Sequence, residues 1–100
     1  MATKRQPYWR TFGTPTVLVL YRTLDGWRYA IYFAEPSGVA DGALHEHVAA
    51  PASEPGIAQA ACHRKAEELT RRHLEVRWRA SDQPDTWTGT VTSAGPSPAV

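Results

Sequence analysis

Hydrophobic and polar residues alternate most regularly in the last third of the chain. Within Leu74–Ala80, apolar residues occupy every second position and Glu75, Arg77 and Arg79 lie between them. The run Thr86–Thr92 alternates in the same way, with threonine at four positions. Because successive side chains of a strand point to opposite faces, the pattern predicts two strands, each with one buried side. Their proximity in the sequence predicts a hairpin.

A second hairpin is predicted earlier in the chain. The runs Val17–Arg22 and Trp27–Ala34 are rich in β-branched and aromatic residues, and Asp25-Gly26 lies between them. An Asp-Gly pair is typical of a hairpin turn, because glycine accepts a positive φ at little cost. The segment Pro7–Phe12 is a candidate for a further short strand before this hairpin.

Between the two hairpins the pattern changes to the spacing of a helix. Ser53 is the expected N-cap, Pro55 stands in the first turn, and we expect the helix to run to about His73. The expected buried stripe consists of small residues for the most part: Ala58, Cys62, Ala66, Leu69 and His73. Upstream, Glu35–Gly56 is interrupted by proline and glycine, and Leu44–Val48 is its candidate for a short edge strand.

These elements predict an α+β fold: an antiparallel sheet of four to five strands, in the order ββ-loop-α-ββ, with one helix packed on one face. A chain of 100 residues is enough for one hydrophobic core. We expect residues 1–6 to be a flexible basic leader, 7–92 to be a single domain and 93–100 to be a disordered tail.

Composition and charge narrow the function classes only slightly. Hydrophobic residues make up 42% of the chain, as in globular proteins, and the formal net charge is +1. This near-neutral total hides a segregation, because residues 1–34 and 59–80 are net basic whereas 35–58 and 81–100 are net acidic. Any electrostatic recognition must therefore be local. The excess of Ala, Arg, Gly and Pro is typical of a high-GC bacterial genome.

The single cysteine, Cys62, excludes an intramolecular disulfide and a cysteine-rich zinc cluster. A lone thiol fits a reducing compartment, so we expect a cytoplasmic protein. The longest aliphatic run, Val17–Leu20, is far shorter than the ~20 residues of a membrane-spanning helix. We therefore expect no association with a membrane.

The sequence contains no recognised catalytic motif. It has no glycine-rich phosphate loop, nucleophile elbow, His-Glu-x-x-His pair or Cys-x-x-Cys pair. Cys62 and His63 are adjacent, but consecutive residues of a helix do not face each other, so Cys62 is expected to be a small core residue. We expect a binding domain without cofactors and lean against an enzyme.

His45 and His47 are candidate metal ligands. If Leu44–Val48 is extended, both imidazoles lie on one side, where they can bind one zinc or another divalent ion. A third ligand is required, and Asp41, Cys62 or His63 are the candidates. The alternative interpretation is an exposed loop whose histidines titrate near neutral pH.

The face of the sheet opposite the helix is the second candidate site. We expect it to collect these residues: Arg22, Arg28, Tyr32, Arg77 and Arg79, with Thr86, Thr88, Thr90 and Thr92. Arginine and aromatic side chains on an antiparallel sheet bind phosphates and stack on bases in single-stranded nucleic acid platforms. Leu18 and Leu20 are expected on the same face, which favours a protein partner. A solvated polar face is a further alternative.

Self-association through the sheet is the function we expect first, because Val17–Leu20 is apolar on both sides and one helix covers only one face. Binding of single-stranded DNA or RNA through the arginine and tyrosine side chains is the alternative. Metal binding through His45 and His47 is the second alternative.

Overall fold

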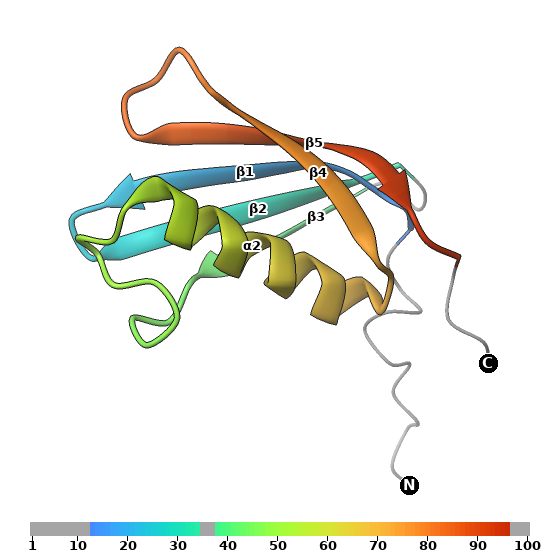
Figure 1. Cartoon of the computed structure of the whole chain (residues 1–100), viewed down its shortest axis with the longest axis horizontal. Helices are drawn as coiled ribbons and strands as arrows, with labels where there is room; N and C mark the ends of the chain where they lie inside the picture. Colours follow the sequence, from blue (N-terminus) through green and yellow to red (C-terminus); the bar gives the residue numbers. More distant parts are fainter. Residues whose placement is uncertain (1–12, 35–37, 97–100) are drawn as a thin grey trace, which may run out of the picture.

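The computed structural model describes residues 13–34 and 38–96. In chain order, the elements are β1 (Pro15–Thr23), β2 (Gly26–Phe33), β3 (Gly38–Ala43), α2 (Pro55–Thr70), β4 (Leu74–Ala80) and β5 (Thr86–Ala94). The strands form one sheet in the order β3-β2-β1-β5-β4, and every neighbouring pair is antiparallel. Helix α2 packs on one face of this sheet, against β1, β2 and β4 (Figure 1). The predicted α+β fold is confirmed.

The β1–β2 hairpin has a two-residue turn, Leu24-Asp25, because Thr23 pairs with Gly26 across it. The Thr23 hydroxyl donates to the carbonyl oxygen of Gly26 at 2.8 Å and accepts from the amide of Asp25 at 3.2 Å. Gly26 has φ = 143°, a conformation that side chains rarely adopt. The turn therefore fixes the register of the whole hairpin.

Helix α2 is shorter than predicted at both ends. Its N-cap is Glu54, with Pro55 in the first turn and no side-chain cap. At the other end Arg71 adopts the left-handed conformation (φ = 56°) and donates its amide to the carbonyl oxygen of Glu67 at 2.8 Å. His73, predicted as the last turn of the helix, therefore lies in the connection to β4.

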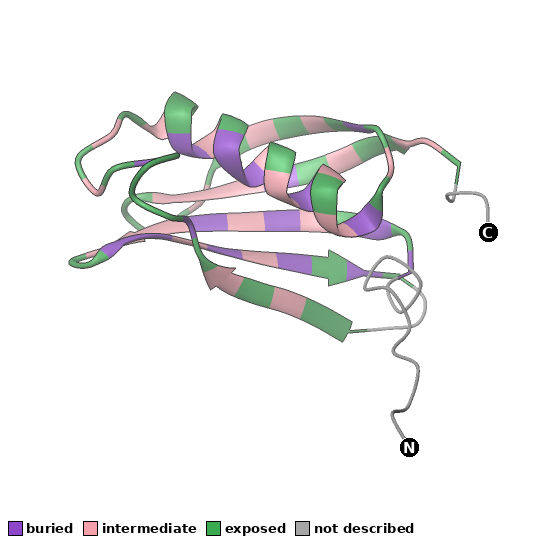
Figure 2. Ribbon diagram, turned by 90° about the horizontal axis from the view of Figure 1, so that it is seen from below, coloured by how far each residue is buried: buried purple, intermediate pink, exposed green. Residues whose placement is uncertain are grey.

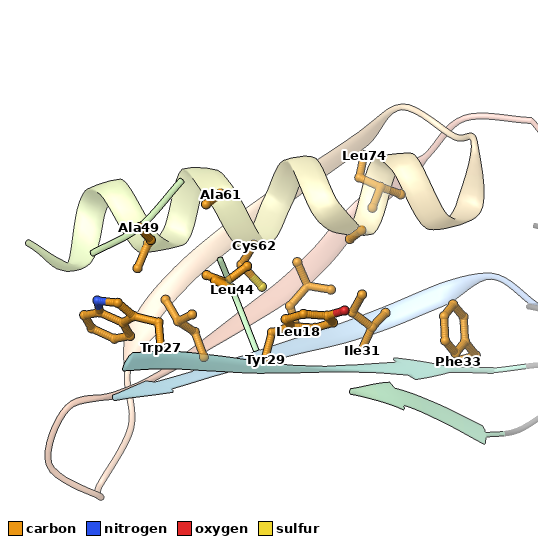
Figure 3. Close-up of a cluster of buried hydrophobic side chains, with 13 residues drawn as sticks. Leu18, Trp27, Tyr29, Ile31, Phe33, Leu44, Ala49, Ala61, Cys62 and Leu74 are labelled. Carbon is orange, nitrogen blue, oxygen red and sulfur yellow. The ribbon is translucent and has the colours of Figure 1, made fainter. Parts of the chain in front are cut away.

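The core lies between α2 and the strands (Figures 2 and 3). The helix contributes small buried side chains: Ala58, Ala61, Cys62, Ala66 and Thr70. The strands supply larger ones, which include Leu18, Leu20, Trp27, Tyr29, Ile31, Phe33 and Leu74. Because the helical side chains are small, the helix approaches the sheet closely and the aromatic and aliphatic residues of the strands fill the space between the two layers.

The predicted edge strand at Leu44–Val48 is wrong, and the edge strand β3 lies immediately before it. The amide of Leu44 still donates to the carbonyl oxygen of Trp27 at 2.9 Å, but the amides of Val48 and Ala49 both donate to the carbonyl oxygen of His45. These two bonds close a turn and end the strand. The sequence of β3, Gly-Val-Ala-Asp-Gly-Ala, has few β-branched residues to reveal it.

Strand β5 continues to Ala94, two positions beyond the predicted end of the domain at 92. The candidate strand Pro7–Phe12, the leader at 1–6 and residues 97–100 lie outside the described residues. Among those described, no helix has the length and apolar character needed to span a membrane.

Candidate functional site

The face of the sheet that points away from α2 is the candidate site, and we call it the open face. Its side chains alternate along each strand with the buried ones, so the strand register assigns them to three rows that cross the sheet. The Val17 row consists of Val39, Tyr32, Val17, Thr90 and Arg77; the Val19 row consists of Asp41, Ala30, Val19, Thr88 and Arg79; the Tyr21 row consists of Ala43, Arg28, Tyr21 and Thr86.

The middle of the open face is apolar. Val17, Val19 and Ala30 are half-buried between their neighbours, whereas Tyr32 and Val39 are 46% and 49% exposed. In the part of the chain that the structure describes, the helix covers the opposite face only (Figure 2). A contiguous exposed patch of this kind is typical of an interaction surface.

Charged side chains lie toward the edges of the open face. Arg77 and Arg79 project from the edge strand β4, with Thr90 and Thr88 as their partners on β5. Asp41 projects from the other edge strand, β3, and Arg28 lies on β2 beside Tyr21. The face is therefore apolar along β1 and around Ala30 and Tyr32 of β2, with Arg77 and Arg79 at the β4 edge, Asp41 at the β3 edge and Arg28 at the Tyr21 end of β2.

The structure places four of the five predicted residues on the open face: Arg28 and Tyr32 on β2, and Arg77 and Arg79 on β4, with β1 and β5 between the two pairs. Arg22 is not on this face. Because the hairpin turn has two residues, Arg22 pairs with Trp27 and lies on the helix side of the sheet. Its guanidinium carbon is 4.3 Å from the centre of the Trp27 ring, and Nη1 donates to the carbonyl oxygen of Pro51 at 2.5 Å. Arg22 therefore anchors the 44–54 segment.

The same strand register shows that the predicted face of two further residues is wrong. Leu18 and Leu20 were expected on the open face, but both are completely buried beneath α2, and Val17, Val19 and Tyr21 take their place. Three further open-face positions on the neighbouring strands were not predicted: Ala30, Val39 and Asp41. Cross-strand pairs counted from Thr23 and Gly26 at the turn assign Val17, Val19 and Tyr21 to the open face, because two paired residues lie on the same face of a sheet.

His45 and His47 are close together but in a turn, not a strand. Their rings stack with centroids 4.6 Å apart, and the backbone amide of His47 donates to Nδ1 of His45 at 3.1 Å. Among the described residues, no group of three or more His, Cys, Asp or Glu side chains is placed to hold a metal ion. The pair therefore offers two ligands and the expected third one is not brought to it.

Cys62 and His63 do not form a nucleophile and base. Cys62 is completely buried in the core, as expected, and burial raises the pKa of its thiol to about 12. The reactive thiolate is therefore disfavoured at neutral pH. Nε2 of His63 instead lies 2.7 Å from the carbonyl oxygen of Leu74, where the ring holds the start of β4.

Glu67 organises the connection between α2 and β4, a role that the sequence did not reveal. Its Oε2 accepts the amide of Leu74 at 2.8 Å and lies 3.5 Å from Nε2 of His63 and 3.3 Å from Nδ1 of His73. A carboxylate between a backbone donor and two imidazoles fixes the direction of the chain at this turn. We assign this cluster a structural role.

A small cavity lies between α2 and the segment that follows β3. Leu44 and Ala61 contribute its apolar lining, and Arg64, Lys65 and Glu68 bring charges of both signs to it. Its volume of about 210 Å³ is below the ~300–1,000 Å³ of sites for drug-sized ligands. The open face is therefore the larger candidate.

No protein-family model matches this chain, and comparison with curated proteins and with solved structures gives no match.

Proposed function

We propose that this domain is a self-association module that binds a second copy of itself through the open face of its sheet. The observation that carries the proposal is the apolar centre of that face, where Val17, Val19 and Ala30 lie side by side on β1 and β2 with Tyr32 and Val39 beside them. Two sheets that pack face to face bury such residues between them. The lone buried thiol of Cys62 fits action in the cytoplasm.

The size of the open face sets the expected affinity. Five strands at ~4.8 Å spacing and about four residue steps of ~3.4 Å give a flat area of roughly 24 by 14 Å. This flat area, about 340 Å², is smaller than the ~800 Å² of accessible surface that each partner buries in a standard interface. The self-association is therefore reversible, with an expected dissociation constant in the micromolar range.

Sedimentation velocity on the full chain, from about 1 to about 200 µM, tests the proposal. We compare the unchanged protein with Tyr32→Lys, which adds a charge to the open face. Val48→Lys is the matched control, because Val48 is 47% exposed, nearly the same as Tyr32 at 46%, and lies outside the three rows. The proposal predicts a concentration-dependent dimer that Tyr32→Lys abolishes and Val48→Lys retains. A strict monomer over the whole range contradicts it.

Binding of single-stranded nucleic acid is a second candidate function. The observation that favours it is the placement of Arg28, Arg77 and Arg79 on the same face as the exposed Tyr32. Guanidinium groups bind phosphates and an exposed ring stacks on a base. Asp41 and Glu75 reduce the positive charge of this face, and Arg22 is absent from it, so this candidate ranks second.

A fluorescently labelled oligonucleotide distinguishes the two functions. Nucleic acid binding predicts that Arg77→Glu/Arg79→Glu removes the anisotropy change and that the change weakens as salt rises. Tyr32→Lys keeps the three arginines but removes the stacking ring, so it is expected to retain the salt-dependent phosphate contacts, to lose base stacking and to prevent self-association. Equal binding by the unchanged protein and the double variant excludes the arginine face as a nucleic acid site.

A further inference from the structure

Charges of opposite sign stand at opposite ends of one row of the open face. In the Val19 row, Asp41 lies on the edge strand β3 and Arg79 lies on the edge strand β4, with Val19 at the middle position. Arg77 is two residues from Arg79 on the same edge, and Glu75 lies farther along β4 beside Ser93. None of the ion pairs found among the described residues uses Asp41, Arg77 or Arg79.

A symmetric pair of sheets has two simple face-to-face arrangements, because the two-fold axis lies between the sheets. An axis perpendicular to the strands places each edge strand over its own copy, so Asp41 faces Asp41 and the β4 arginines face each other. An axis parallel to β1 exchanges the edges, since β1 is the central strand of the five. Asp41 of each copy then faces the β4 edge of the other.

We infer that the second copy binds with the two-fold axis parallel to β1, so that Asp41 of each copy pairs with Arg79 of the other. This inference rests on the proposed self-association and specifies its geometry. Val19 then meets Val19 at the axis, and Ala30 lies over Thr88. The apolar centre is buried, and an ion pair closes each end of the row. Like charges at these positions oppose the other arrangement.

The expected geometry of packed sheets is compatible with these pairs. Aligned sheets lie ~10 Å apart and are rotated by ~30°, which displaces the edge strands along their length by about 5 Å. Arginine spans this separation, and Arg77 and Arg79 are one pleat repeat apart on β4. A shift toward residue 77 places Asp41 of the second copy between Arg77 and Arg79, whereas the opposite shift leaves Arg79 as its partner, offset by about 5 Å along β4.

A charge-reversal cycle in the full chain tests the inference by sedimentation velocity. Asp41→Arg and Arg79→Asp each turn two attractive contacts into two repulsive ones, and each is expected to weaken self-association about tenfold. The double variant restores both attractions and is expected to return to the affinity of the unchanged protein. A 1:1 mixture of the two single variants is expected to form mixed dimers, because one copy carries arginine and the other aspartate at both positions.

Matched controls account for the changes in net charge. Asp25→Arg at the exposed turn and Arg64→Asp on the exposed side of α2 repeat the two charge changes away from the three rows. If the single variants weaken self-association no more than these controls, the inferred axis is overturned but self-association stands. The same conclusion follows if the double variant self-associates as weakly as the single variants. An unchanged protein that is monomeric at every concentration overturns the inference together with the proposed function.

Discussion

Gly89 allows β5 to pass beneath two bulky side chains, so Gly89→Ala is expected to destabilise the fold. Gly89 is buried and pairs with Leu18 on one side and with Trp78 on the other. A Cβ atom at this position lies 2.7 Å from Cγ1 of Val76 and 3.0 Å from Cε3 and Cζ3 of Trp78. Both side chains pack against the core, and overpacking of this kind costs about 1–3 kcal/mol.

Gly56→Ala is the matched control for this prediction. An alanine at Gly56, in the first turn of α2, meets no atom within 4 Å. It is expected to raise the free energy of unfolding by up to about 1 kcal/mol, through helix propensity and the loss of freedom in the unfolded chain. Because both variants reduce that freedom alike, the difference between them isolates the packing at Gly89.

Urea denaturation followed by tryptophan fluorescence measures both variants at one low protein concentration. Gly89→Ala is expected to lower the free energy of unfolding by about 1–2 kcal/mol relative to the unchanged protein, since the overpacking exceeds the gain from the unfolded state. The slope of the transition is expected to stay the same. A Gly89→Ala protein as stable as Gly56→Ala would refute the packing described here.

Three further predictions concern the core and the candidate sites. Burial raises the pKa of Cys62 from 9.0 to about 12, so its contribution to the free energy of unfolding is present below pH 9 and is lost as the pH rises toward 12. In urea titrations, Cys62→Ala is expected to lower the free energy of unfolding less at pH 11 than at pH 8, and an equal loss at both pH values contradicts this. Arg22→Ala removes the contacts with Trp27 and Pro51 and is expected to lower the free energy of unfolding by about 2 kcal/mol. Because Arg22 lies on the helix side of the sheet, the variant is expected to self-associate as the unchanged protein does, and weaker dimerisation in sedimentation would place Arg22 on the interface. Zinc is expected to leave the melting temperature unchanged, and a rise that disappears in His45→Ala would show that the stacked histidines bind it.

The fold was predictable where the hydrophobic pattern has a single interpretation. The alternation in Leu74–Ala80 assigned the faces of β4 correctly, and the small residues around Cys62 predicted the buried side of α2. In contrast, all four residues of Val17–Leu20 are apolar, so both faces of this strand are apolar and the pattern does not show which two residues are buried. The two-residue turn makes that choice through the register, which buries Leu18 and Leu20.

Other features depend on contacts between residues that are distant in sequence. Strand β3 is held by pairing with β2 and packs Gly42 beneath the Tyr29 ring, so its own residues carry little strand signal. Glu67 is one of two adjacent carboxylates in α2, beside Glu68, and its approach to the amide of Leu74 distinguishes it. Likewise, Asp41 and Arg79 reach one row of the open face only through the order of all five strands.

An NMR dilution series on the full chain, with the backbone amides assigned, tests the central claim most directly. Self-association through the open face predicts that shifts change with concentration for Val17, Val19 and Ala30, together with their neighbours on β5. The amides on the exposed side of α2, such as that of Arg64, are expected to remain constant. Spectra that do not change with concentration, or changes confined to α2, would contradict self-association through this face.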